Sequence, residues 1–333
     1  MRIRTPMVRL LSLLLLSLTL LLAACGGQSQ SAASPTAAPT ATPIPAVDAN
    51  GTPIAFPTSA PQRIVSLVPS TSEVLAALGV ANHIVAVDYY TNYPASVAAL
   101  PKISDASSKY NIEQIVALKP DLVLSYGNLT QQYDSKLKSL GLNVVVLPVA
   151  NFSQALQQIL LVGRLTSTQD VASKLVGQLQ QQIDQIKSTV AGTTAPKVMI
   201  ELDYSTPGKP YVFGGGSFGD DLLIDANATD IFHDNTSGQG YPQVSDEAVI
   251  AANPQYVILT EDPKYGGGPA TVYKRPNWSN IDALKNKHVY YVNSDLMSRP
   301  GPRLVEGLRC VAQLVHPDKF SGALPADCTV AAA

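Results

Sequence analysis

Short apolar runs rich in β-branched residues alternate with segments of helical periodicity from residue 63 onward. Seven of these runs predict strands: Ile64–Val68, Ile84–Val87, Leu122–Leu124, Val144–Leu147, Val198–Leu202, Tyr256–Leu259 and Val289–Val292. Between the first two runs, Ser70 opens a short predicted helix that ends at Gly79. Strands separated by helices at this spacing predict an α/β fold with mainly parallel sheets.

One helix–proline–strand pattern occurs twice. The segments 111–124 and 245–259 each begin with an N-cap candidate, carry Glu two positions later, and carry Pro seven positions after that Glu. Each segment then continues into a predicted strand. The repetition indicates two lobes of similar construction.

A single long helix is predicted between the two lobes. Ser167 and Asp170 form a capping-box-like start. Apolar residues then recur every three or four positions, at Val171, Leu175, Leu179, Ile183, Ile186 and Val190. A helix of about 24 residues is roughly 36 Å long, so we expect a stiff connection between the lobes.

The first residues form an export signal. Arg2, Arg4 and Arg9 precede the apolar run Leu10–Leu22, which is shorter than the roughly 20 residues that span a bilayer. Small residues and then Cys25 follow, an arrangement that resembles the bacterial lipoprotein signal. In that class the cysteine carries lipid and becomes the mature N-terminus. The alternative is an ordinary signal peptide with a chance cysteine.

These patterns divide the chain into six parts. The predicted boundaries are a signal peptide at 1–24, a lipidated and Pro-rich tether at 25–60, an N-terminal α/β lobe at 61–165, a linking helix at 166–191, a C-terminal α/β lobe at 195–320 and a tail at 321–333. The tether is rich in Pro, Ser, Thr and Ala, a composition that favours extended chain.

Composition excludes several classes of protein. The 333 residues are 46% hydrophobic and carry a formal net charge of −2, which argues against a disordered chain and against a nucleic-acid binder. Four histidines show no short metal-ligand spacing, so no metal site is expected. No nucleophile elbow is present, and Asp220-Asp221 has no adjacent His. An exported enzyme is therefore the weaker alternative.

Five motifs in order carry a family resemblance. They are Arg63–Glu73, Asp88–Pro94, Asn111–Asp121, Tyr241–Ser245 and Ser298–Arg303. Together they resemble the solute-binding proteins that serve ABC importers of vitamin B12, iron-siderophores and haem, over residues 61–320. The chain is most similar to the vitamin B12 binders, through Tyr90–Pro94, Pro242–Ser245 and Asp295–Arg303.

The resemblance implies a fold and a function. It implies two Rossmann-like lobes joined by a single long rigid helix, in a monomer that is no enzyme and holds no cofactor. We expect a lipid-anchored protein on the extracytoplasmic face of the cell membrane. It would capture cobalamin or a related corrinoid and deliver it to an ABC permease dimer with its ATPase. A ferric siderophore and haem are the alternative ligands.

The resemblance also implies ligand-binding residues. Aromatic rings suit the flat face of a macrocycle, and the matching positions are Tyr90, Tyr93, Tyr126, Tyr211 or Phe213, and Tyr241. Asp295 and Arg299 match polar residues of the cleft. The pattern departs from the vitamin B12 binders where Ser107, Tyr126 and Tyr241 stand in place of Trp. The alternatives are plain packing for each Tyr and a surface ion pair for Asp295 and Arg299.

Two further expectations concern pairs of residues. Glu113 and Glu247 match surface glutamates that dock against arginines of a two-fold permease in the resembled family. Favourable interaction with the helix dipole is the alternative role for each Glu. Cys310 and Cys328 are predicted to form a disulfide, because export favours such bonds and Cys25 is expected to carry lipid. The alternative is two unpaired thiols.

Overall fold

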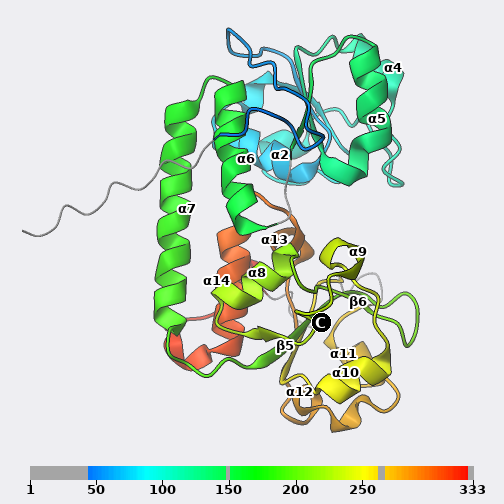
Figure 1. The fold of residues 1–333 in the computed structure, drawn as a ribbon, viewed down its shortest axis with the longest axis vertical. Coiled ribbons are helices and arrows are strands. Elements are labelled where there is room, and N and C mark those ends of the chain that lie inside the picture. The colour runs from blue at the N-terminus through cyan, green and yellow to red at the C-terminus, as the bar shows by residue number, and fades with distance from the viewer. Residues whose placement is uncertain (1–43, 148–150, 262–266, 329–333) are drawn as a thin grey trace, which may run out of the picture. The chain divides into compact units, whose positions relative to one another are not determined.

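The computed structural model describes residues 44–147, 151–261 and 267–328 (Figure 1). The predicted signal peptide and the predicted lipidation site Cys25 lie outside the described residues. Among the helices that are described, none combines the length and the apolar character needed to cross a membrane.

The first sheet contains four parallel strands in the order β2-β1-β3-β4. They are β1 (Ile64–Ser66), β2 (Ile84–Val87), β3 (Leu122–Tyr126) and β4 (Val144–Leu147). The helices of this part are α2 (Pro69–Ala77), η1 (Ala81–His83), α3 (Ala95–Ala98), α4 (Ile112–Ala117), α5 (Gly127–Ser139) and α6 (Phe152–Leu165). The strands are almost continuously apolar because a parallel sheet is buried on both faces. We call this part the first lobe.

The second sheet has the order β6-β5-β8-β9, with β7 also paired to β5. Its strands are β5 (Lys197–Asp203), β6 (Tyr211–Val212), β7 (Thr229–Asp230), β8 (Tyr256–Leu259) and β9 (Val289–Tyr291). All pairs are parallel except β5 with β6. We call the part built on this sheet the second lobe. All seven predicted strands are confirmed. The strands β6 and β7 were not predicted, because each has two residues and is too short to show a periodic pattern.

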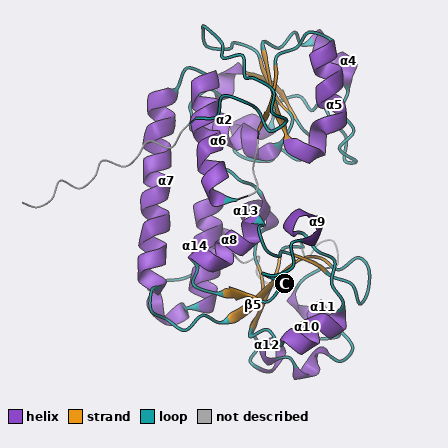
Figure 2. Cartoon of the chain, in the orientation of Figure 1, coloured by secondary structure: helices purple, strands orange, loops and turns teal. Residues whose placement is uncertain are grey.

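Helices of 3 to 12 residues surround the second sheet (Figure 2). They are α8 (Phe218–Asp225), α9 (Ser237–Gly240), α10 (Asp246–Ala252), α11 (Pro269–Val272), η3 (Trp278–Asn280), α12 (Asp282–Lys285), α13 (Ser294–Ser298), α14 (Leu304–Val315), η4 (Pro317–Lys319) and η5 (Ala326–Cys328). The largest apolar core is continuous from the first sheet through α6 to α8 and α14. The rings of Phe152 and Phe218 stack at 4.9 Å where α6 meets α8.

The long helix is α7 (Gln169–Val190), which packs against α6 and α14 (Figure 1). Its predicted start at Ser167 is wrong: Ser167 has a left-handed backbone (φ 59°), and Thr168 is the N-cap without a side-chain cap bond. The chain reverses direction over the three residues between α6 and α7, and the left-handed Ser167 lies in the middle of that turn. Close packing of Ala172 on Gly163 also buries Ala172 and leaves Val171 exposed, contrary to prediction.

The repeated helix–proline–strand unit is confirmed in detail. Asn111 Oδ1 accepts a hydrogen bond from the amide of Gln114 at 3.0 Å, and Ser245 Oγ accepts one from Ala248 at 3.2 Å. The backbone repeats as well, because the residues directly before the two prolines, Lys119 and Asn253, have φ of 47° and 49°. Helix, left-handed residue, proline and strand therefore recur as one structural unit.

The start of the first helix differs from the prediction. α2 begins at Pro69, whose fixed φ suits the first helical position. Ser70 and Ser72 lie within the first turn and are buried. Ser72 Oγ hydrogen-bonds Ser66 Oγ at 2.9 Å, so this serine ties the helix to β1 rather than capping it.

The predicted tether extends too far toward the lobe. Residues 44–57 fold against the first lobe: Ala49 N donates to Val146 O at 2.9 Å, beside the edge strand β4. Asp48 accepts hydrogen bonds from the amides of Asn50 and Thr52 and pairs with Lys138 Nζ at 2.9 Å. The local turn made by this Asp was the missed signal, since Asp side chains readily hydrogen-bond the amide two residues on.

The tail is joined to the last long helix. Cys310 in α14 and Cys328 in η5 form a disulfide, with their Cα atoms 5.4 Å apart. Gln313 Nε2 donates to Gly322 O at 3.0 Å inside the same loop. The segment after α14 therefore packs on the second lobe.

Candidate functional site

The strand order reverses at one place in each sheet. In the first sheet β1 lies between β2 and β3, and in the second β5 lies between β7 and β8. Ligands of open α/β sheets bind outside the carboxyl ends of strands at such switch points. Tyr126 ends β3 at the first of these positions.

The loop after β2 presents three tyrosines to solvent. Tyr89, Tyr90 and Tyr93 are each 48% exposed. The buried carboxylate of Asp88 holds the loop, because it accepts hydrogen bonds from Tyr90 N at 2.9 Å and from Thr91 Oγ1. Burial raises the pKa of Asp88. The predicted residues Tyr90 and Tyr93 are therefore exposed rings on an anchored loop.

The second lobe contributes a smaller aromatic group. Tyr241 and Tyr211 are 39% and 41% exposed, whereas Phe213 is 1% exposed. The Phe213 ring packs 5.6 Å from the Tyr241 ring and against Gly219, where an added Cβ would lie 2.2 Å from it. Phe213 therefore supports Tyr241 from the core and does not line a surface. Of the predicted pair, Tyr211 stays the candidate.

Tyr126 and Tyr241 come from different lobes and lie near enough for a charge on Tyr241 to act on Tyr126. Burial raises the pKa of the Tyr126 hydroxyl, and the charge of an ionised Tyr241 would raise it further. Burial also raises the pKa of Tyr241. Both hydroxyls consequently stay protonated at neutral pH and are able to donate hydrogen bonds.

A polar cluster connects the tyrosine loop to the second lobe. Arg299 Nη2 pairs with Asp295 Oδ1 at 2.7 Å, but the two side chains are only 11% and 19% exposed, so this is no simple surface ion pair. The pair is not isolated, because Asn92 Nδ2 donates to Asp295 Oδ2 at 2.9 Å and Asn92 Oδ1 accepts from Arg299 Nη1 at 2.7 Å. One amide side chain of the first lobe thus bridges both predicted polar residues.

Glu73 anchors the same cluster from α2. Its carboxylate accepts hydrogen bonds from Arg303 Nε at 2.9 Å and Nη2 at 2.7 Å, and from Arg299 Nη1 at 3.2 Å. The side chain of Glu73 is 2% exposed, and those of Arg299 and Arg303 are 11% and 13% exposed. Arg303 also stacks over the Tyr93 ring, 4.2 Å from its centroid. Two carboxylates and two guanidinium groups therefore neutralise one another here.

Sequence reasoning missed Glu73, Asn92 and Arg303 as members of the site. All three lie within the family motifs, at Arg63–Glu73, Asp88–Pro94 and Ser298–Arg303. Their motif positions were the available signal. Nothing in the linear spacing shows that residues more than 200 positions apart form hydrogen bonds.

Glu113 and Glu247 occupy the same position in the two copies of the repeated unit. Both side chains are exposed in the first turns of α4 and α10. Hydrogen bonds from its own backbone amide and from Ser245 lower the pKa of Glu247. A carboxylate in the first turn interacts favourably with the helix dipole. This interaction does not prevent the same carboxylate from docking against a permease, the role predicted for it.

Within residues 44–147, 151–261 and 267–328, no three His, Cys, Asp or Glu side chains gather where a metal ion could bind. His233 Nδ1 lies 2.9 Å from Asp220 Oδ1. That pair involves one imidazole and provides no metal-binding cluster.

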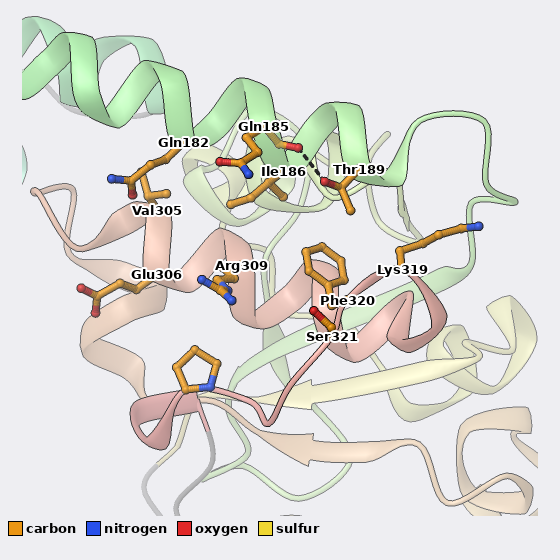
Figure 3. Close-up of a pocket in the computed structure, with 11 residues that line it drawn as sticks. Gln182, Gln185, Ile186, Thr189, Val305, Glu306, Arg309, Lys319, Phe320 and Ser321 are labelled. Carbon is orange, nitrogen blue, oxygen red and sulfur yellow. Dashed lines mark hydrogen bonds between the residues drawn. The ribbon is translucent and has the colours of Figure 1, made fainter.

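A hollow of about 360 Å³ lies on the second lobe between α7, α14 and the tail (Figure 3). Gln182 and Gln185 come from α7, Arg309 comes from α14, and Lys319 and Phe320 follow it. No predicted site residue lines this hollow. It is a feature of the tail packing, separate from the tyrosines.

Comparison with known proteins gives a consistent picture. Residues 64–296 match the family described as periplasmic binding protein. A relative from Bacillus subtilis, the uncharacterized ABC transporter substrate-binding lipoprotein YvrC, is 32% identical over 78% of this chain and 82% of its own. The vitamin B12-binding protein of Vibrio cholerae is 26% identical over 75% of this chain and 87% of its own.

A solved structure agrees with the fold. It is a possible iron-binding, periplasmic solute-binding protein from Staphylococcus epidermidis, which is 30% identical and superimposes with a TM-score of 0.68. The superposition covers 77% of this chain and 99% of that one. The matched proteins are binding proteins, not enzymes.

Proposed function

Because the chain belongs to the periplasmic binding protein family, we propose that it is the solute-binding protein of an ABC importer and that its ligand is cobalamin or another corrinoid. The protein would capture this ligand outside the membrane and deliver it to a permease dimer with its ATPase. The relatives named for vitamin B12 binding and for ABC transport support this role.

The proposed ligand is chosen on the charge balance of the polar cluster. Arg299 and Arg303 are the arginines next to the exposed tyrosines, and both are paired with carboxylates. Anionic ligands, such as haem with its propionates or a catecholate chelate, are best recognised by guanidinium groups free to form forked hydrogen bonds. A corrinoid has a broad ring and an amide periphery, so it suits a neutral cluster with amide and carboxylate partners beside aromatic rings.

A ferric siderophore is the second candidate. The similarity to the possible iron-binding protein from Staphylococcus epidermidis favours it, and ferric hydroxamates are neutral enough to fit the same charge argument. Ligand binding must therefore be measured on a panel of compounds.

The test is a thermal-shift and calorimetry panel on tagless mature protein. Cyanocobalamin, a ferric hydroxamate, a ferric catecholate and haemin are added in separate samples. A ligand that binds only the folded state raises the apparent melting temperature. We expect cyanocobalamin to raise it and to be recovered unchanged. No shift at saturating cyanocobalamin, with a shift for another compound, would reassign the ligand.

We also propose that Cys25 carries a lipid and anchors the protein on the extracytoplasmic face as a monomer. The lipoprotein-type signal in the sequence supports this anchoring, as does the lipoprotein relative. Cys25→Ser should move the protein from the membrane fraction to the soluble extracytoplasmic fraction. An unchanged membrane fraction would contradict the anchor.

A further inference from the structure

The helices α4 and α10, which carry the predicted docking residues Glu113 and Glu247, are held differently at their first turns. In α10, Asp246 Oδ2 accepts a hydrogen bond from Tyr204 Oη at 2.8 Å, and Asp246 N donates to Gly208 O at 3.0 Å. Gly208 N in turn donates to Tyr204 Oη at 2.9 Å. In α4 the residue equivalent to Asp246 is Ile112, which cannot form this hydrogen bond. The Tyr204 link is thus specific to the second lobe.

Tyr204 is itself held by a buried ion pair. Arg275 forms two hydrogen bonds of 2.6 Å with the carboxylate of Glu201. These residues are 9% and 3% exposed. The Arg275 guanidinium lies 3.5 Å from the centroid of the Tyr204 ring and 4.6 Å from that of Trp278. The position of the tyrosine is therefore determined from inside the lobe.

The inner end of this network belongs to the strand pair that carries the candidate ligand residue Tyr211. Glu201 of β5 pairs with Val212 of β6, beside Tyr211. The outer end is Asp246, the residue directly before Glu247. Contacts thus run without a gap from the β5–β6 pair through Arg275 and Tyr204 to the docking helix.

The network favours a defined geometry more than stability. A buried ion pair is often no more stabilising than well-packed apolar residues. Asp246 Oδ1 is buried and has no hydrogen-bond partner among the described residues. The Tyr204 hydroxyl is then the side-chain partner that fixes this carboxylate at the first turn of α10.

We propose that Tyr204 is a positioning residue for Glu247 and holds α10 in register with the β5–β6 strand pair. The inference rests on the proposed docking role of Glu247. Tyr204 acts through Asp246 and the helix start and touches neither ligand nor permease. Its loss should weaken docking and leave ligand capture unchanged.

The first experiment is hydrogen–deuterium exchange on full mature Tyr204→Phe protein. Phenylalanine keeps the ring under Arg275 and removes both hydrogen bonds of the hydroxyl. We expect amides of 246–252 to exchange about five- to tenfold faster, the effect of losing the hydrogen bond to Asp246, while 112–117 in the first lobe stay unchanged. Ser205→Ala, which removes a hydrogen bond to Asp203 in the same loop, is the matched control. Equal exchange in wild type and Tyr204→Phe overturns the proposal.

The second experiment is a double-mutant cycle on labelled cyanocobalamin uptake, with Tyr204→Phe and Glu247→Ala alone and together. If Tyr204 acts through Glu247, Tyr204→Phe lowers uptake by itself and has no further effect in the Glu247→Ala protein. Equal losses in both backgrounds overturn the positioning role. Normal uptake by Glu247→Ala alone refutes the docking role first, and the inference fails with it. Normal uptake by Tyr204→Phe while Glu247→Ala is impaired refutes the inference alone.

Discussion

Glu73 and Arg303 lie 230 positions apart in the chain, and their side chains meet in two hydrogen bonds of 2.7 and 2.9 Å. The pair joins α2 of the first lobe to the residue before α14 of the second. Arg299 reaches the same carboxylate. The two lobes are therefore linked by buried charges as well as by α7.

The first prediction concerns this link. Glu73→Gln leaves two guanidinium groups without their shared carboxylate, so we expect the free energy of unfolding to fall by about 3 kcal/mol. Urea denaturation at pH 7 measures the change. Glu113→Gln, an exposed glutamate in the same lobe, is the control and should have little effect. If Glu73→Gln lowers the free energy of unfolding no more than Glu113→Gln does, the ion pair does not stabilise the contact between the lobes.

A second prediction concerns the pH dependence of stability. Asp230 is buried in β7, and burial raises its pKa from 3.8 to about 7, with the charge of Asp220 adding to the effect. Its Oδ2 has no hydrogen-bond partner among the described residues. The folded state therefore retains a proton that the unfolded state loses above pH 3.8, so this group lowers stability progressively between about pH 4 and 7.

Asp230→Asn should remove that pH dependence, because an amide keeps the acceptor for Phe232 N and carries no charge. We expect the variant to be more stable than wild type at pH 8, by on the order of 2 kcal/mol, and to lose this advantage near pH 4. Thermal unfolding from pH 4 to 8 measures the difference. If the melting temperatures of the two proteins change in parallel between pH 4 and 8, Asp230 is not neutral in the folded state.

The third prediction tests the aromatic residues. Tyr126→Ala and Tyr241→Ala should each weaken cyanocobalamin binding about tenfold or more, since each removes a large ring from the proposed ligand face. Tyr273→Ala, also an exposed tyrosine of the second lobe, should bind normally. Isothermal titration calorimetry gives the affinities. Equal affinities for all three variants would exclude Tyr126 and Tyr241 as ligand contacts.

A fourth prediction concerns the tail. The disulfide between Cys310 and Cys328 closes a loop over 18 positions, and a loop of this size contributes about 3 kcal/mol through the unfolded chain. Cys310→Ser with Cys328→Ser should lower the melting temperature and leave ligand affinity unchanged. Thiol labelling of unreduced, denatured wild type should detect neither cysteine. Two labelled thiols would refute the bond.

The strands and the repeated unit were predictable because their signals are local. Apolar runs such as Val144–Leu147 and N-cap residues such as Asn111 act on their immediate neighbours. The start of α7 was not predictable, because close packing between Gly163 and Ala172 decides where the chain turns. The folding of residues 44–57 was not predictable for a similar reason, because their apolar side chains are partly buried only by contact with the first lobe.

The candidate site was predictable in type but not in arrangement. The family resemblance implied that Tyr90, Tyr93, Tyr211 and Tyr241 bind ligand; all four are exposed, and their contact with a ligand stays a prediction. They could not show that Phe213 lies in the core, because burial depends on how Gly219 packs. Nor could they show that Asn92 bridges Asp295 and Arg299, since that contact exists only once the lobes have folded together.

The last prediction concerns Glu113 and Glu247. Each is exposed at the first turn of one copy of the repeated helix, so the helix dipole accounts for either carboxylate alone. It does not account for the same position being used in both lobes. Two equivalent carboxylates on two similar lobes match a permease dimer with two equivalent basic patches, where such charges set orientation more than affinity.

Glu113→Ala and Glu247→Ala should therefore each reduce uptake of labelled cyanocobalamin through the importer, and the double variant should reduce it most. Ligand affinity in solution should stay within about twofold of wild type, because neither glutamate is among the proposed ligand contacts. Asp282→Ala, an acid in the first turn of α12 whose side chain is 41% exposed, is the control for loss of surface charge and should transport normally. Normal transport by the double variant would refute docking, and a parallel loss of ligand binding and transport would place the defect in the fold.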